Sequence, residues 1–221
     1  ARPTPAPCRA HWKNTRRRTE RGLSPGVLTM SIPPMNNEHS PARCIELARV
    51  AVQAQQFDQA RAVLIGGLRQ HPADAELHGE LGRLCLARRR LPEAEAHLGL
   101  ALQASPDNAM LHTDLAEVFS RRGDWQRAAA SYRKAVSLAP GLVRATLGLS
   151  NALHPLGHDP EALAALDALL AIRPGEGAVL RAKIDLLTTL GRHAEALAVA
   201  EPEIGKAELN LGLFDRWCEL L

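Results

Sequence analysis

The chain has 221 residues, of which 46% are hydrophobic and only 3% aromatic, and its formal net charge is +3. This length suits one elongated domain, and alanine and leucine are abundant, as close packing of helices requires. No run of 18 apolar residues occurs, which excludes a membrane-spanning helix. No stretch of useful length alternates between apolar and polar residues as a β-strand does.

Residues 1–40 are rich in proline and arginine and show no helical period, so we expect a disordered tail. Residues 1–30 carry seven basic side chains and one acidic side chain, so the rest of the chain has a net charge of about −3. Three interpretations stay open: an arm that binds nucleic acid or an acidic membrane, an organelle transit peptide, or an inert segment. In the last case translation would start at Met30 or Met35, and residues 1–29 would be an artefact of gene prediction.

The four cysteines do not form a CxxC pair, which argues against a disulfide framework or a zinc site. Free thiols are typical of a reducing compartment, so we expect a cytoplasmic protein with buried or half-buried cysteines. The residues concerned are Cys8, Cys44, Cys85 and Cys218.

Several columns of residues recur every 34 residues. Prolines stand at Pro72, Pro106, Pro140 and Pro174. Small residues stand at Ala60, Ala94, Ala128 and Ala162; leucines at Leu47, Leu81, Leu115 and Leu149; and large residues at Leu64, Leu98, Tyr132 and Leu166. Columns in register over four units indicate a repeat array in which each unit is one supersecondary element.

Residues 109–142 show what one unit contains. Apolar residues recur at helical spacing before Gly123, a residue suited to end a helix, and again between Trp125 and Pro140. We therefore predict two helices in each unit. Small residues such as Gly82 would let the helices approach closely, and the leucine column would face the core. No single pair of helices buries both of its apolar faces, so the units must stack.

This order of leucine, small, aromatic, alanine and proline positions resembles the tetratricopeptide repeat family. Residues 109–142 carry the signature at Leu115, Ala116, Phe119, Gly123, Ala128, Tyr132, Ala135 and Pro140. The resemblance covers residues 41–205 and divides them into units 41–74, 75–108, 109–142, 143–176 and 177–205. It implies an all-α fold, a right-handed α-solenoid of about five helix-turn-helix units.

The C-terminal part of the array is less regular. Pro155 should shorten the first helix of the fourth unit, and Lys183 replaces an expected leucine in the fifth. Pro202 falls inside the last predicted helix of the array, where proline costs about 3 kcal/mol, so we expect a break or kink near Glu201. Residues 206–221 predict a final helix that either caps the array or begins a missing unit.

The residue patterns of enzymes and metal sites do not occur in this sequence. Gly66 and Gly67 lack the rest of a phosphate-binding loop, and the nine histidines form no HExxH motif. His78 and His112 occupy the same column and would be neighbours on stacked helices, but two ligands alone make a poor zinc site. We therefore expect no catalytic residue, no metal and no cofactor.

The family resemblance also implies where a partner would bind. In tetratricopeptide arrays the first helix of each unit lines a concave groove, and positions 2, 5, 6, 9, 12 and 13 of the unit face it. Position 6 reads Glu46, Glu80, Asp114, Gly148 and Ala182, and position 9 reads Arg49, Arg83, Glu117, Asn151 and Asp185. Two interpretations stay open. The charges pair within their own helices at i,i+3, or they form a polar groove that binds a peptide.

We expect a non-catalytic scaffold that binds a protein or peptide partner in this groove. The candidate peptide-binding residues are Glu46, Arg49, Glu80, Arg83, Asp114, Glu117, Arg121 and Asn151. Nucleic acid is expected to bind only through the basic tail, and no small-molecule substrate is expected. The alternative function is that of a recruiting arm of an enzyme, such as a sulfotransferase or glycosyltransferase, whose catalytic domain lies outside this chain.

Overall fold

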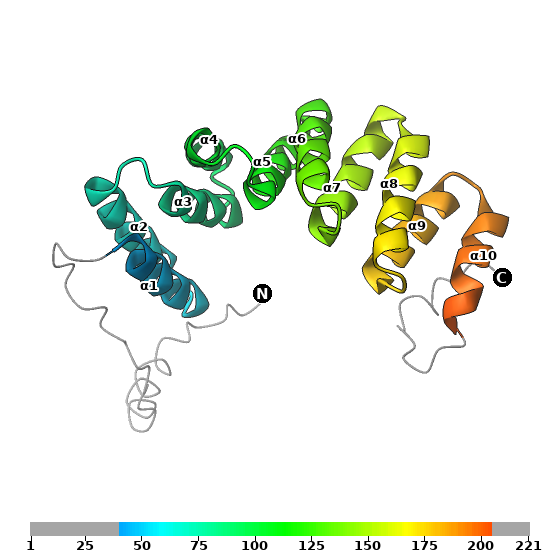
Figure 1. The fold of residues 1–221 in the computed structure, drawn as a ribbon, viewed down its shortest axis with the longest axis horizontal. Helices are drawn as coiled ribbons and strands as arrows, with labels where there is room; N and C mark the ends of the chain where they lie inside the picture. The colour runs from blue at the N-terminus through cyan, green and yellow to red at the C-terminus, as the bar shows by residue number, and fades with distance from the viewer. Residues whose placement is uncertain (1–39, 205–221) are drawn as a thin grey trace, which may run out of the picture. The chain divides into compact units, whose positions relative to one another are not determined.

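The structure is a computed structural model that describes residues 40–204, and these residues form helices joined by short turns (Figure 1). The α-helices are α1 (Pro41–Gln53), α2 (Phe57–Gln70), α3 (Ala75–Ala87), α4 (Leu91–Ala104), α5 (Ala109–Arg122), α6 (Trp125–Leu138), α7 (Val143–Leu153), α8 (Asp159–Ile172), α9 (Gly177–Thr189) and α10 (His193–Ile204). One 3₁₀ turn, η1 (His154–Leu156), follows α7.

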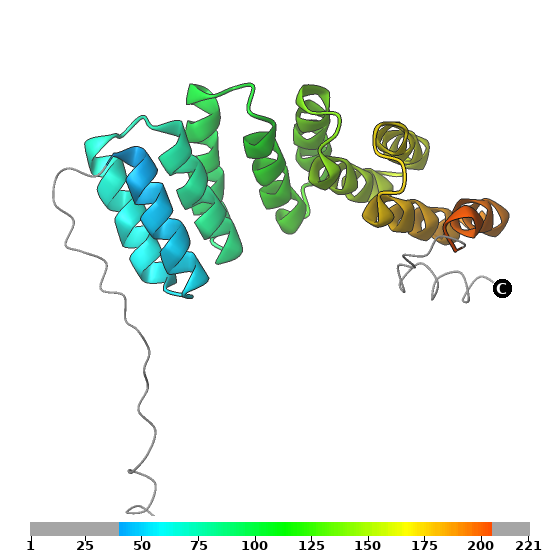
Figure 2. The same ribbon diagram turned by 60° about the horizontal axis from the view of Figure 1, so that its bottom comes forward.

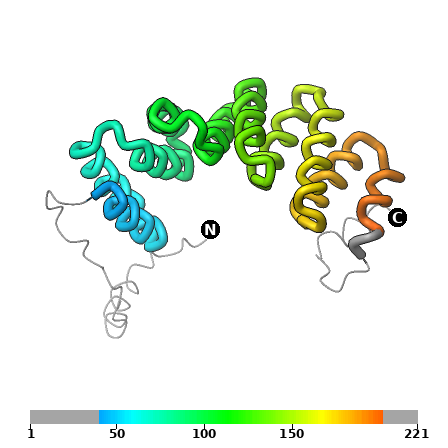
Figure 3. The backbone as a smooth tube through the Cα atoms, in the orientation of Figure 1, coloured from blue at the N-terminus to red at the C-terminus, as the bar shows by residue number. Residues whose placement is uncertain are grey.

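Each helix packs against the next one in the sequence, as the backbone trace in Figure 3 shows. Each odd-numbered helix also contacts the following odd-numbered helix: α1 with α3, α3 with α5, α5 with α7, and α7 with α9. Contacts that are confined to neighbours in sequence define a solenoid. The predicted all-α solenoid is therefore confirmed.

The turn inside each helical pair has the same backbone conformation throughout the described array. A residue with positive φ recurs every 34 residues, at Gln55, Arg89, Gly123, Gly157 and Gly191. The residue that follows donates its N–H to a carbonyl five residues back, as Asp124 does to Phe119 at 3.0 Å. This hydrogen bond satisfies a carbonyl at the helix end. Glycine adopts the conformation without strain, whereas Gln55 and Arg89 adopt it with a side chain attached.

Small residues bring the helices close together, as predicted. A Cβ atom at Gly82 would lie 2.7 Å from Cγ of Leu98, so α3 and α4 meet there without room for a methyl group. A Cβ atom at Gly148 of α7 would overlap the ring of Tyr132 on α6. The contact at Gly82 uses the small residue after the leucine position, whereas Gly148 precedes Leu149 and stands at position 6 of its unit. Both glycines meet the large residue of a second helix, Leu98 or Tyr132.

The leucine column is buried with one exception. Leu47, Leu81 and Leu149 are buried in the core. Leu115 is only half-buried and packs against the edge of the core. Leu115 thus faces the core but is less completely covered than the other leucines, and the neighbouring Ala116 and Phe119 are buried. The described cysteines, Cys44 and Cys85, are buried as expected.

The structure accommodates the irregular residues of the C-terminal units in different ways. α7 ends at Leu153 and Pro155 lies in the 3₁₀ turn, which confirms the shortened helix. The helix does not break at Glu201, because α10 continues through Pro202 to Ile204. Lys183 replaces the expected leucine and binds the carboxylate of Asp167 on α8.

Some predictions lie outside the described residues. They concern the basic tail of residues 1–39, the final helix predicted over 206–221, and the thiols Cys8 and Cys218. Among residues 40–204, the helices lack the length and apolar character needed to cross a membrane.

Candidate peptide-binding face

The first helices of successive units form one surface. Because α1, α3, α5, α7 and α9 each contact the next helix of this series, their exposed side chains are continuous. We call this surface the first-helix face, and Figure 2 shows the backbone of the helical array that carries it. All the candidate residues belong to four of these helices. They are Glu46 and Arg49 on α1; Glu80 and Arg83 on α3; Asp114, Glu117 and Arg121 on α5; and Asn151 on α7.

Charged side chains link neighbouring first helices. Arg49 on α1 donates from Nε to Oε1 of Glu80 on α3 at 2.8 Å. Nη2 of Arg83 on α3 lies 2.9 Å from the same oxygen, and its Nη1 lies 3.2 Å from Oδ2 of Asp114 on α5. Position 9 of one unit therefore binds position 6 of the next. The i,i+3 pairing considered from the sequence accounts for only one of these contacts, that between Arg83 and Glu80.

Arg144, in the first turn of α7, joins this set from the other side. Its Nη2 lies 2.6 Å from Oδ1 of Asp114 and 2.6 Å from Oε2 of Glu117. Arg121 donates to Oε1 of Glu117 at 2.6 Å and to the backbone carbonyl of Leu86 on α3 at 2.8 Å. Arg144 was not among the residues predicted from the sequence, although it stands at position 2, which the family resemblance places on the groove.

These seven residues form what we call the charge network: Arg49, Glu80, Arg83, Asp114, Arg144, Glu117 and Arg121. The side chain of Asp114 is fully buried, with 0% exposure, whereas Arg144 is 44% exposed. Burial alone would raise the pKa of Glu80, but the hydrogen bonds and charges of Arg83 and Arg49 hold it below its ordinary value. Glu80 is therefore ionised and already paired, and the network fixes the first helices to one another.

Two hollows lie on the part of the face formed by the N-terminal units. One, of about 300 Å³, lies between α1 and α3 and is mainly apolar, with Ala48, Val52, Leu84 and Ala87 among its lining residues. The other, of about 410 Å³, is mainly polar and extends from α1 to Leu111 on α5. Glu46 lines neither hollow and pairs with Arg43 at 2.6 Å.

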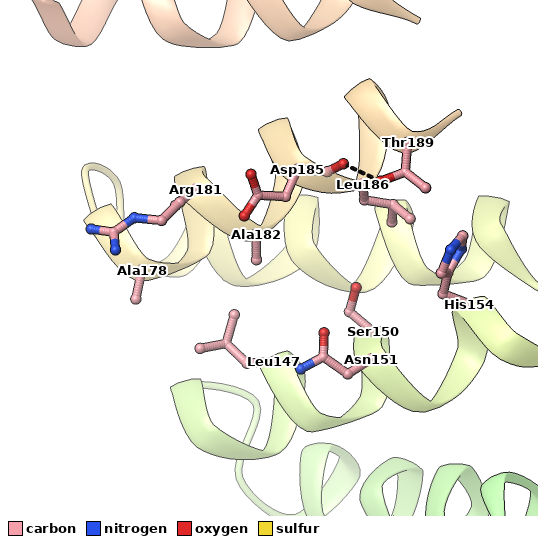
Figure 4. A pocket seen from close by; sticks show the side chains of 10 residues that line it. All are labelled: Leu147, Ser150, Asn151, His154, Ala178, Arg181, Ala182, Asp185, Leu186 and Thr189. Carbon is pink, nitrogen blue, oxygen red and sulfur yellow. Dashed lines mark hydrogen bonds between the residues drawn. The ribbon is translucent and has the colours of Figure 1, made fainter. Parts of the chain in front are cut away.

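A further pocket, of about 370 Å³, lies between α7 and α9 (Figure 4). Position 6 is occupied here by Gly148 and Ala182, so no charged pair crosses between the two helices at this position. Ser150 and Asn151 point from α7 toward α9, whose Arg181 and Asp185 line the opposite wall. The side-chain amide of Asn151 is exposed and makes no hydrogen bond with residues 40–204. It therefore presents both a donor and an acceptor to this pocket.

The histidine column does not bring His78 and His112 together. Nε2 of each ring instead lies within hydrogen-bonding distance of a proline carbonyl six residues earlier, Pro72 at 2.9 Å and Pro106 at 2.8 Å. Nδ1 of His78 lies 3.2 Å from Nδ1 of His97 on α4. Within residues 40–204, no group of three or more histidine, cysteine or carboxylate side chains is arranged to hold a metal ion.

Solved structures with the same architecture include several repeat proteins. TTC0263 of Thermus thermophilus is 20% identical with a TM-score of 0.60, and the match covers 82% of this chain and 98% of that one. YrrB, described as a protein with an unusual peptide-binding site, is 18% identical with a TM-score of 0.64, covering 82% and 93%. PilF of Pseudomonas aeruginosa is 16% identical with a TM-score of 0.67, covering 81% and 88%. At these identities the likeness shows the fold alone.

Family models identify the repeat directly. Two models, each described as tetratricopeptide repeat, match residues 45–109 and residues 119–184. Together they cover more than half of the sequence. No curated protein matches the chain. The matched residues, the 34-residue period and the stacked helical pairs agree, and the chain therefore belongs to the tetratricopeptide repeat family.

Proposed function

We propose that this protein is a non-catalytic scaffold that binds an extended peptide segment of a partner protein along the first-helix face. The observation that carries the proposal is the pocket between α7 and α9, into which Asn151 presents an amide without a partner among residues 40–204. An extended peptide exposes both N–H and C=O groups, and one side-chain amide satisfies both. The repeat family supports the coarser role, since its arrays serve protein–protein interaction.

The two ends of the face have complementary roles in this proposal. The small side chains of Ala178 and Ala182 leave room for a peptide backbone to approach α9. The apolar hollow between α1 and α3 would accept an aliphatic side chain of the same segment, because Val52 on its wall is 39% exposed. Burial of this apolar surface provides affinity, and the hydrogen bonds of the amide fix the position of the peptide along the face.

The charge network fixes α1, α3, α5 and α7 to one another, so it holds the two proposed sites at a set distance along the face. Its carboxylates are paired with arginines, so Glu80, Asp114 and Glu117 act on the ligand indirectly. Glu46 and the exposed edge of Arg49 are the candidate residues best placed to contact ligand charges at the N-terminal end. YrrB, which shares the fold, is described as having a peptide-binding site, a property that the proposal extends to this chain.

A displayed peptide library tests the proposal, because selection from a library needs no identified partner. Peptides selected on the full chain should bind the Asn151→Ala variant about tenfold more weakly, as expected for loss of amide hydrogen bonds to a ligand backbone. Gln126→Ala, which removes an exposed amide from the second helix α6, is the matched control and should bind as the parent does. Failure to select any peptide, or equal binding by both variants, would contradict the proposed site.

A further inference from the structure

A small cleft lies away from the charge network, between the second helix α2 and the turn that joins α3 to α4. It has a volume of about 130 Å³ and is lined by Phe57, Asp58, Arg61, Leu84, Cys85, Arg88 and Arg90. Three guanidinium groups therefore line one cleft, and among its described lining residues Asp58 is the only carboxylate. An arrangement of this kind favours an anion, because guanidinium forks match the oxygens of phosphate and carboxylate groups.

The arginines of this cleft are incompletely paired. Nε of Arg61 is buried and makes no hydrogen bond with residues 40–204. Glu93 on α4 lies 2.6 Å from Nη2 of Arg90 but 3.7 Å from Nη2 of Arg61. Arg88 lies over the ring of Phe57, 4.9 Å from its centroid, and binds no carboxylate within the described residues. A buried donor without an acceptor costs free energy, which a bound oxyanion would recover.

In the next pair of units, a carboxylate of the protein itself occupies the equivalent site. Adding 34 to Arg61, Arg88, Arg90 and Glu93 gives Glu95, Arg122, Asp124 and Arg127. There the carboxylate of Glu95 binds Arg122 and also accepts from Arg127 at 2.9 Å. Two cations and two anions thus balance. One unit earlier, Arg61 occupies the position of that carboxylate, so three cations face one anion at the same four positions.

The end of a helix adds to this positive potential. α2 begins at Phe57, and its N-cap residue Gln56 makes no capping hydrogen bond through its side chain. In the third unit Asp124 caps α6 by accepting from the N–H of Arg127 at 3.2 Å. The uncapped N–H groups of α2 and the helix dipole therefore favour negative charge beside the cleft. Asp58 and Glu93 reduce the positive charge but leave the site with one net cation.

We propose that this cleft binds a phosphate group, either as the free ion or as the phosphoryl group of a small phosphomonoester. Phosphate is favoured over carboxylate because its tetrahedral oxygens can accept from Arg61, Arg88 and Arg90 at the same time. The cleft shares Leu84 with the apolar hollow of the first-helix face, but its arginines belong to α2 and to the turn between α3 and α4. The assignment therefore does not depend on the proposed peptide-binding function.

The test is a titration of the full chain with inorganic phosphate at constant ionic strength, read from the arginine Nε–H signals in ¹H–¹⁵N NMR spectra. The signal that disappears in the Arg61→Glu variant belongs to Arg61. It should shift saturably in the parent protein, with a midpoint on the order of 1 mM. Arg61→Glu supplies the carboxylate that Glu95 supplies one unit later, so it should keep the fold and weaken the phosphate response at Arg88 at least tenfold. Arg122→Gln removes a cation from the equivalent filled position and should respond as the parent does.

Two further titrations, with methyl phosphate and with acetate, identify the ligand. A methyl phosphate titration that saturates in the same range assigns the site to phosphomonoesters as well, whereas saturation by inorganic phosphate alone assigns it to the free ion. Acetate at the same ionic strength should bind at least tenfold more weakly. The absence of a saturable shift, a response that survives unchanged in Arg61→Glu, or an equal response to acetate would overturn the assignment.

Discussion

Nη2 of Arg144, at the start of α7, lies 2.6 Å from Oδ1 of Asp114, whose side chain is fully buried on α5. Arg83 approaches the other carboxylate oxygen at 3.2 Å from α3. A buried carboxylate is tolerated only when cations compensate it, so three consecutive first helices depend on this one group. Reversing the charge of Asp114 would therefore destabilise the array, and loss of binding by such a variant would not report on the groove.

The Arg144→Gln variant should lower the free energy of unfolding by about 2 kcal/mol, because it leaves the buried Asp114 with one cation. Urea denaturation followed by circular dichroism measures this change. The control is Arg43→Gln, which removes an exposed i,i+3 partner of Glu46 and should cost less than about 0.5 kcal/mol. Equal effects of the two substitutions would show that Asp114 does not need Arg144.

The sequence predicts the helical pairs, because they follow from a 34-residue period and helical spacing. The columns that would face a groove are implied only by the resemblance to the tetratricopeptide repeat family. The sequence does not predict the partners within those columns. The side chains of Arg49 and Glu80 meet although 31 residues separate them in the sequence, and those of Arg144 and Glu117 meet across 27 residues. Which side chains meet depends on how far one unit is rotated against the next. The repeat column suggests His78 beside His112, but the contact of His78 is with His97, within the same unit and across the α3–α4 pair.

Substitution by glycine in the turns of the first two units should make the protein more stable. Gln55 and Arg89 have φ values of 60° and 58°, in a region where glycine is favoured and where Gly123 stands in the third unit. Arg89→Gly should raise the free energy of unfolding by about 0.5–1 kcal/mol, since the relief of left-handed strain exceeds the added entropy of the unfolded chain. The reverse change, Gly123→Ala, should destabilise by a similar amount, although no atom lies within 4 Å of the new methyl group. Thermal denaturation of both variants measures the two changes in stability, and stabilisation by Gly123→Ala would contradict this account.

Gly148 should be the least replaceable glycine of the described helices. A methyl group there would overlap the Tyr132 ring, so Gly148→Ala should cost about 1–3 kcal/mol through overpacking between α6 and α7. Gly99→Ala is the control within a helix, because a Cβ atom there meets nothing within 4 Å. It should stabilise α4 by about 0.5–1 kcal/mol. Chemical denaturation gives both values, and similar effects at the two glycines would mean that α6 and α7 do not meet closely at this point.

The contact between His78 and His97 should make stability depend on pH. Nε2 of His78 donates to the Pro72 carbonyl, so its Nδ1 accepts from Nδ1 of His97. Burial, together with the charges of His78 and Arg61, lowers the pKa of His97 below its ordinary value of about 6.5, although Glu93 opposes this.

A base with a lowered pKa in the folded state binds fewer protons there than in the unfolded chain. The stability that neutral His97 provides is therefore present above pH 6.5 and is lost as the pH falls through that value toward the folded pKa. The carboxylates Glu80 and Glu117 do not titrate in this range, because their arginine partners hold their pKa values below the ordinary range. Unfolding free energies measured between pH 5 and pH 7.5 should fall less steeply with acid in His97→Gln, whose amide can still donate to His78. Parallel pH profiles for the parent and the variant would show that this pair does not couple folding to protonation.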